Sequence, residues 1–267
     1  MARRTSSNSE RNRRPSPRGP LRIRELLQKL PARRRLARRI LVLQETASTN
    51  DHARNLLADA GGERPSLDGW LVAAETQTAG RGRKARDWWS GPSGSNLAVS
   101  LILVPPTNPF EAMGILGACA LAAALLPWTA ARIGVKWPND LLLDGAKVAG
   151  LLCEVPALAG PGRSPAGRPG ETHQGAILGL GVNLLATPPS PTLPYPVTCL
   201  VDHARLPPDR TAILGRWILE LEKRLAHFES RGPRDLELEF LGLLRAWAPV
   251  GVGPYPEDPA LPSGPLV

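Results

Sequence analysis

The pattern of apolar and polar positions predicts short strands and helices that follow one another along most of the chain. Residues 40–45 alternate as a strand, and further strands are predicted over residues 70–75, 96–104 and 176–184. Helices are predicted over residues 49–60, 110–126, 209–230 and 233–247. The first helix has Ser48 or Thr49 as its N-cap and Gly61-Gly62 after its end, and the second stops at Pro127. This order indicates a mixed α and β fold.

A tight hairpin is predicted over residues 141–148, whose centre is an Asp-Gly pair. In the simplest register Leu142 faces Lys147 and Asp140 faces Ala149. Asp140 and Lys147 then lie diagonally on one face, within reach of each other. Asp140 could orient the Lys147 ammonium or hold hydroxyls or an amide of a ligand, and an ordinary cross-strand ion pair is the alternative.

Composition is that of a soluble chain with one substantial core. With 267 residues and 42% hydrophobic content, one or two domains are expected. No apolar run reaches 18 residues, so no membrane span is expected. Cys119, Cys153 and Cys199 are scattered and odd in number, which favours reduced core cysteines over a disulfide framework or a zinc site. These features predict a cytoplasmic protein.

The formal net charge of +9 is concentrated at one end of the chain. Residues 1–39 hold 14 of the 33 Lys and Arg and two of the 24 Asp and Glu, so the remainder has a net charge of −3. The composition of residues 1–39 predicts a disordered basic tail. A solvated tail is the first interpretation, and non-specific binding to nucleic acid or anionic lipid, or a transit peptide, are alternatives. A Pro- and Gly-rich segment over residues 156–175 is predicted to be a mobile loop.

Residues 80–89, Gly-Arg-Gly-Arg-Lys-Ala-Arg-Asp-Trp-Trp, combine flexible backbone, positive charge and aromatic surface. Glycines let backbone N–H groups approach an anion, arginines present planar forks, and tryptophan can cover an apolar ring. The segment suits a nucleotide or an acyl-adenylate, and a solvated basic loop or an RNA-binding patch is the alternative. The chain has 28 Arg and five Lys, yet Lys84, Lys136 and Lys147 all lie in or beside motifs, which suggests selection for a compact point charge.

Four further motifs surround this loop in sequence. They are Ala-Ser-Thr-Asn at 47–50, Glu-Thr-Gln-Thr-Ala at 75–79, Lys-Trp-Pro-Asn-Asp at 136–140 followed by Lys-Val-Ala-Gly at 147–150, and Gly-Leu-Gly-Val-Asn at 179–183. Together and in this order they closely resemble the catalytic domain of biotin–protein ligases. The resemblance implies an α+β fold, with a mixed, largely antiparallel sheet and packed helices, as in the biotin and lipoate ligases and class II synthetases. It places the catalytic domain over residues 40–248.

The resemblance also implies a reaction and a site. Biotin and ATP would form biotinyl-5′-AMP, with Mg²⁺ accompanying ATP, and biotin would pass to a lysine of a carboxylase's biotin carboxyl carrier domain. The expected catalytic residues are Lys147, Arg83 and Asp140. The expected biotin and adenylate contacts are Ser48, Thr49, Asn50, Gln77, Gly80, Arg81, Gly82, Arg83, Trp88, Lys147, Gly150 and Asn183. Trp88 is expected to fold over the adenylate, and no metal bound by protein side chains is expected. A homodimer is compatible with these features.

The sequence departs from the family pattern in three places. Ala85 replaces the third glycine of the loop, which is costly if this position has a positive φ, and Asp87 places an anion beside the tryptophans. Only about twenty Pro-rich residues follow Trp247, so residues 249–267 replace the usual small C-terminal β-domain. No helix-turn-helix precedes the domain, so we expect no binding to specific DNA.

Two other functions fit parts of this pattern. A lipoate or octanoate ligase would show an Arg-Arg-x-x-Gly-Gly-Gly stretch, which is absent. A non-catalytic biotin-binding regulator would be favoured by a helix-turn-helix.

Overall fold

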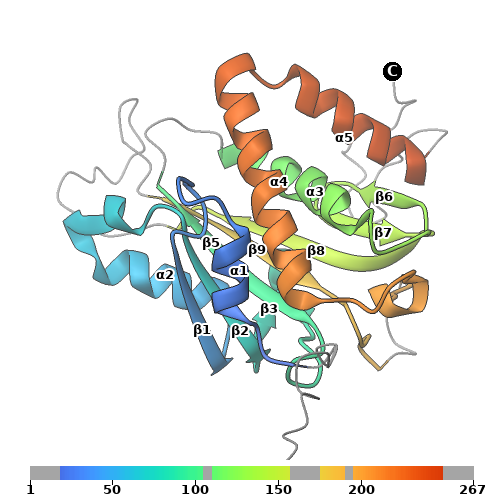
Figure 1. Ribbon diagram of the computed structural model, residues 1–267, viewed down its shortest axis with the longest axis horizontal. Coiled ribbons are helices and arrows are strands. Elements are labelled where there is room, and N and C mark those ends of the chain that lie inside the picture. Colours follow the sequence, from blue (N-terminus) through green and yellow to red (C-terminus); the bar gives the residue numbers. More distant parts are fainter. Residues whose placement is uncertain (1–18, 105–109, 157–174, 190–194, 249–267) are drawn as a thin grey trace, which may run out of the picture.

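A seven-stranded mixed sheet forms the centre of the molecule (Figure 1). The computed structural model describes residues 19–104, 110–156, 175–189 and 195–248. The strands lie in the order β1 (Arg39–Thr46), β2 (Trp70–Gln77), β5 (Leu97–Leu103), β9 (Ala176–Val182), β8 (Ala146–Glu154), β7 (Asp140–Leu143) and β6 (Ile133–Lys136). β1 and β2 are parallel, and every other neighbouring pair is antiparallel. This confirms the predicted α+β class with a largely antiparallel sheet.

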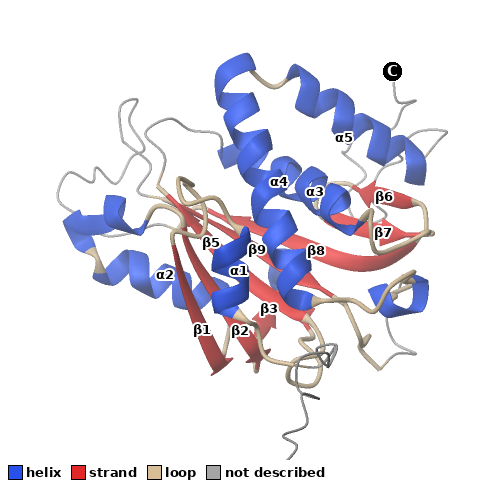
Figure 2. Ribbon diagram, viewed as in Figure 1, coloured by secondary structure: helices blue, strands red, loops and turns tan. Residues whose placement is uncertain are grey.

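Helices cover one face of the sheet, and a single helix covers part of the other (Figure 2). The covering layer contains α1 (Ile23–Lys29), α3 (Phe110–Leu125), α4 (Arg210–Arg231) and α5 (Arg234–Trp247), and the opposite face carries α2 (Thr49–Asp59). Alternation along β9 explains the division, because Leu178 and Leu180 belong to the core under the helical layer while Ile177 packs with Leu57 of α2. Gly179 and Gly181 share the face of Ile177, which leaves space above the sheet there.

Short elements complete the fold. A two-stranded hairpin is formed by β3 (Gly80–Arg81) and β4 (Asp87–Trp88), with the 3₁₀ turn η2 (Arg83–Ala85) between them. The 3₁₀ segments η1 (Gly61–Leu67) and η3 (Leu200–His203) follow α2 and precede α4. The predicted helices, and the predicted strands outside the Asp-Gly hairpin, are confirmed with ends that differ by at most two residues, and Ser48 is the N-cap of α2. The second strand of the hairpin, β8, continues to Glu154. The sequence pattern did not predict α1, β3, β4 or β6.

The prediction of a disordered tail through residue 39 is wrong for residues 19–39. Leu21, Leu26, Leu30 and Leu36 are all buried in the main core, and α1 packs against α4. The average composition of residues 1–39 predicted disorder because many arginines outweigh these few leucines. Carboxylates neutralise part of that charge, as in the pair between Arg22 and Asp209 at 2.6 Å. Residues 1–18 lie outside the described residues, as do 157–174, where most of the expected mobile loop falls, and the expected C-terminal tail at 249–267.

The hairpin of β7 and β8 forms with a register that differs from the prediction. Leu142 faces Lys147 as expected, but a β-bulge follows, and Asp140 faces Gly150 instead of Ala149. The bulge places one extra residue, Val148, on β8. Simple alternation would put Lys147 and Gly150 on opposite faces, and the extra residue brings them to the same face.

Candidate active site

A cavity of about 830 Å³ opens on the sheet face that the large helical layer leaves uncovered. Its walls are the N-terminus of α2, the β3–β4 hairpin, the turn at residues 136–140 and the segment at residues 195–197. Every residue that the sequence nominated contributes to the lining: Ser48, Thr49, Asn50, Gln77, Gly80, Arg81, Gly82, Arg83, Trp88, Asp140, Lys147, Gly150 and Asn183. The fold therefore gathers motifs separated by about 135 residues in sequence around one space.

Three glycines form the floor of the cavity. Gly150 of β8 pairs with Gly181 of β9, and Gly179 lies two residues earlier on the same strand. A Cβ atom at Gly181 would lie 2.3 Å from the Trp88 indole, and one at Gly179 would lie 2.3 Å from Oδ1 of Asn50. Glycine is therefore needed at both positions so that these side chains can approach the sheet.

The polar wall at the start of α2 depends on the parallel pairing of β1 and β2. Thr46 at the end of β1 pairs with Gln77 at the end of β2, so the residues that follow β1 meet the Gln77 side chain. The Thr49 backbone N–H and hydroxyl donate to Gln77 Oε1 at 2.8 and 3.0 Å, and Gln77 Nε2 donates to Ser90 Oγ at 3.1 Å. Ser48 Oγ accepts from the Asp51 N–H at 3.4 Å. Hydrogen bonds within the protein therefore hold this wall in place without a ligand.

Asn50 continues the wall, and two residues that the sequence did not nominate hold its amide. Nδ2 donates to Glu154 Oε2 at 2.7 Å, and Oδ1 lies 2.5 Å from Ser100 Oγ. Ser100 is fully buried on β5 and also lies 2.8 Å from the Thr49 hydroxyl. These contacts determine which way the Asn50 amide points.

Lys147 and Asp140 form an ion pair at the cavity wall, with Nζ 2.8 Å from Oδ1 and side chains only 16% and 18% exposed. The contact expected from the hairpin exists even though the register differs. The Lys147 ammonium also lies 5.7 Å from the centroid of the Trp88 ring and 5.4 Å from that of Tyr195. Tyr195 was missed because it lies in a Pro-rich segment without periodicity. The Lys147 backbone fixes that segment by accepting from Thr198 N–H at 2.9 Å.

The glycine-rich loop is the β3–β4 hairpin. Lys84 and Ala85 at its tip have φ of 54° and 56°, so Ala85 occupies a position where glycine would be less costly. A Cβ atom at Gly80 would lie 2.6 Å from the Trp88 carbonyl oxygen, so the first glycine allows the two strands to approach. Arg83 is exposed at the tip and lines the cavity.

Arg81 lies in the cavity wall, but its guanidinium contacts carboxylates. It donates to Asp51 at 2.6 Å from Nη2 and 3.2 Å from Nε, and to Glu154 at 3.3 Å from Nη1. The hydrogen bond to Asp51 is the main factor that raises the pKa of Arg81 above its usual value. Asp51 and Glu154 were not predicted, because a carboxylate in the first turn of a helix and one at a strand end have ordinary surface explanations.

Two other motif residues have structural partners. Asn183 Nδ2 donates to the Thr198 carbonyl at 3.2 Å, and Asn139 Nδ2 donates to the Leu151 carbonyl at 2.8 Å. Glu75, in the motif at 75–79, points away from the cavity into the helical layer.

The cavity lining carries an excess of positive charge. Six lining side chains are cationic and two are anionic; the cations are Arg81, Arg83, Lys84, Arg86, Lys136 and Lys147, and the anions are Asp87 and Asp140. Such an excess in a concave site attracts a polyanion. Across the described residues, no three His, Cys, Asp or Glu side chains gather closely enough to hold a metal ion. The same residues contain no helix that could span a membrane.

Comparison with known families defines the class. Residues 45–161 match the Biotin/lipoate A/B protein ligase family, a stretch that contains the loop and the Lys147 hairpin. The fold is similar to that of the biotin protein ligase from Aquifex aeolicus in complex with biotin and ATP, with a TM-score of 0.59 and 22% identity over 78% of each chain.

Relatives in sequence identify one family within this class. The chain is 32% identical over 203 residues to the biotin–acetyl-CoA-carboxylase ligase of Mycobacterium tuberculosis, covering 74% of this chain and 68% of the relative. It is 36% identical over 197 residues to the corresponding ligase of Paracoccus denitrificans, covering 68% and 73%. The chain belongs to the biotin–protein ligase family, and the prediction of a ligase enzyme is confirmed.

Proposed function

We propose that the cavity converts biotin and ATP to biotinyl-5′-AMP and then transfers biotin to a lysine of a carboxylase's biotin carboxyl carrier domain. The observation that carries this proposal is the Lys147–Asp140 pair beside the glycine floor, in a cavity whose lining is strongly cationic. The cavity volume of about 830 Å³ falls within the usual range of ligand sites, roughly 300–1,000 Å³. Family membership supplies the choice of biotin.

The first half-reaction joins two anions. An oxygen of the biotin carboxylate attacks the α-phosphorus of ATP in line, and pyrophosphate leaves. Lys147 and Arg83 neutralise the negative charge that develops, and Asp140 orients the Lys147 ammonium through their contact at 2.8 Å. The backbone of residues 80–82 lies along the same wall and can donate to phosphate oxygens. Mg²⁺ enters as part of the nucleotide substrate and requires no cage of protein ligands.

The polar wall at α2 suits the biotin ring system. Ser48, Thr49, Asn50 and Gln77 surround one end of the cavity, where a ureido group needs directional donors and acceptors. Gly150 and Gly181 let the Trp88 indole lie against the sheet, where it gives the cavity a flat aromatic wall for the ligand. Asn183 fixes the neighbouring wall through Thr198.

In the second half-reaction the ε-amine of the carrier lysine attacks the activated carbonyl carbon, an amide forms, and AMP leaves. Closure of the loop protects the mixed anhydride from water until the carrier arrives. Because the reaction uses ATP and a carboxylase carrier domain, we place it in the cytoplasm.

ATP–pyrophosphate exchange tests this function. The protein is incubated with biotin, lipoate or octanoate as the only acid, and we expect exchange with biotin alone, followed by labelling of a carrier domain. Exchange with lipoate or octanoate would favour that branch of the wider family. Binding of biotin without any exchange would indicate a regulator.

A further inference from the structure

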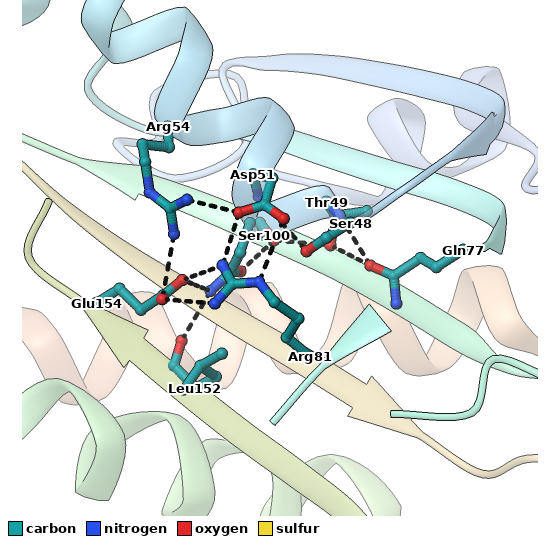
Figure 3. Close-up of polar contacts among 10 residues, drawn as sticks. Ser48, Thr49, Asp51, Arg54, Gln77, Arg81, Ser100, Leu152 and Glu154 are labelled. Carbon is teal, nitrogen blue, oxygen red and sulfur yellow. Dashed lines mark hydrogen bonds and ion pairs between the residues drawn. The ribbon is translucent and has the colours of Figure 1, made fainter. Parts of the chain in front are cut away.

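Four charged side chains form a closed ring of ion pairs at the edge of the cavity (Figure 3). Asp51 and Arg54 come from α2, Arg81 comes from β3, and Glu154 is the last residue of β8. The nitrogen-to-oxygen distances are 2.6 Å for Arg54–Asp51, 2.6 Å for Arg81–Asp51, 3.2 Å for Arg54–Glu154 and 3.3 Å for Arg81–Glu154. Two cations and two anions alternate, so the ring is neutral and ties three elements together.

The ring controls the start of the glycine-rich loop. Asp51 accepts from both Nε and Nη2 of Arg81, a two-point contact that fixes the orientation of the guanidinium plane. Arg81 pairs with Asp87 across the β3–β4 hairpin, and the next residue, Trp88, rests on Gly181. The position of Arg81 therefore influences where the covering tryptophan lies.

The ring also reaches the biotin end of the cavity. Glu154 accepts from Arg81 Nη1 at 3.3 Å through Oε1, and its Oε2 accepts from Asn50 Nδ2 at 2.7 Å. One side chain at the end of β8 thus connects the loop to the polar wall (Figure 3).

Arg81 is poorly suited to bind a phosphate while this ring is intact. A phosphate would have to replace charge-assisted hydrogen bonds to two carboxylates. Arg83 and Lys147 also line the cavity, and neither belongs to the ring.

We propose that Asp51 and Glu154 are positioning residues that hold the glycine-rich loop over the cavity through Arg81, and that Arg81 anchors the loop instead of binding phosphate. This inference rests on the proposed function and assigns a role to residues outside the reacting centre. A secure anchor keeps Trp88 and Arg83 near the cavity and lowers the cost of closing the loop on biotin and its adenylate.

Trypsin provides a test that does not depend on activity. Cleavage after Arg83, Lys84 and Arg86 is followed by mass spectrometry in the ligand-free protein. Asp51→Asn and Glu154→Gln should be cleaved there about five to ten times faster than wild type, because loss of the anchor opens the loop more often. Glu239→Gln breaks a comparable pair with Arg224, between α4 and α5, and should leave the rate unchanged. Equal rates in all four proteins would overturn the anchoring role.

Exchange kinetics separate anchoring from phosphate binding. Asp51→Asn should raise the KM for biotin about tenfold and leave kcat within about threefold of wild type, as expected when uniform binding is lost. The double variant Arg81→Ala/Asp51→Asn should have the same KM for biotin as Arg81→Ala alone, because both substitutions break the same Arg81–Asp51 contact. The inference would be overturned if Arg81→Ala lowered kcat about a hundredfold while Asp51→Asn had no effect. If the wild-type protein shows no ATP–pyrophosphate exchange with biotin, lipoate or octanoate, the proposed function fails. The trypsin cleavage rates then still test whether Asp51 and Glu154 anchor the loop.

Discussion

Glu75 and Arg210 form an ion pair at 2.6 Å in which both side chains are only 3% exposed. Glu75 lies on β2 and Arg210 is the first residue of α4, so the pair joins the central sheet to the helical layer. The second carboxylate oxygen of Glu75 accepts from the Leu21 N–H at 3.0 Å. One buried carboxylate therefore holds two distant segments, and one of them lies where composition predicts a disordered tail.

This arrangement makes part of the N-terminal segment essential for stability. Deleting residues 1–35 removes Leu21, Leu26 and Leu30 from the core. Burying each leucine stabilises a protein by about 1.5–3 kcal/mol, so we expect a loss of roughly 5 kcal/mol or more. Deletion of residues 1–18 alone is the control, and urea unfolding of the two truncated proteins measures the difference in stability. Equal stability of the two truncated proteins would contradict the packing of α1.

Lys147→Ala should reduce ATP–pyrophosphate exchange by about 10²-fold or more, because a fixed charge contact in an enclosed site is lost. Asp140→Asn should have a smaller effect in the same direction, since it only frees the Lys147 ammonium. Lys223→Ala on the exposed side of α4 is the matched control. Near-normal exchange by a folded Lys147→Ala protein would exclude the proposed role.

Arg83→Gly should weaken retention of biotinyl-5′-AMP, because a cation at the loop tip is removed. The released adenylate would label bystander proteins, which can be quantified by adding albumin to the reaction. Ala85→Gly should retain the adenylate as well as or better than wild type, because glycine tolerates the observed φ of 56°. Unchanged labelling by Arg83→Gly would show that the loop tip does not hold the intermediate.

Gly181→Ala should impair adenylation while the protein stays folded. The added methyl group would lie 2.3 Å from the Trp88 indole, so the ring must move off the cavity floor. We expect a higher KM for biotin and a change in tryptophan fluorescence. Gly242→Ala, where a new Cβ meets nothing within 4 Å, is the control. An unaltered KM for biotin in Gly181→Ala would mean that biotin binding does not depend on the position of the Trp88 indole against the sheet.

Thiol ionisation should limit stability at high pH. Burial raises the pKa of Cys119 and Cys199 to about 12 and that of Cys153 to about 11, above the ordinary 9.0. The unfolded chain loses these protons first, so stability is retained below pH 9 and falls as pH rises from 9 toward 12. Urea midpoints at pH 8, 9 and 10 measure the slope, and a variant with all three cysteines changed to alanine should show a shallower one. A midpoint that does not fall above pH 9 would contradict thiol burial.

Local sequence signals predicted much of the site. The Asp-Gly turn and period-two alternation brought Asp140 and Lys147 together, although the bulge at Val148 has no comparable signal. Local sequence signals also predicted strand ends and helix caps, such as the N-cap at Ser48. The partners of Arg81 could not be predicted, because Asp51 and Glu154 meet it only after the sheet has formed. Helix α1 was not predicted because its leucines lie among arginines in the sequence, and its packing against α4 depends on the tertiary structure.

The parallel pairing of β1 and β2 makes the two ends of the active site depend on different folding events. The β7–β8 hairpin, with Asp140 and Lys147, closes through contacts between near neighbours in sequence. Thr49 meets Gln77 only after the crossover through α2 has brought β2 alongside β1. Contacts over such a separation form slowly compared with those of a hairpin. When the full-length chain refolds, the pair of Lys147 and Asp140 can therefore form from local contacts, whereas the contact between Thr49 and Gln77 must wait for the crossover.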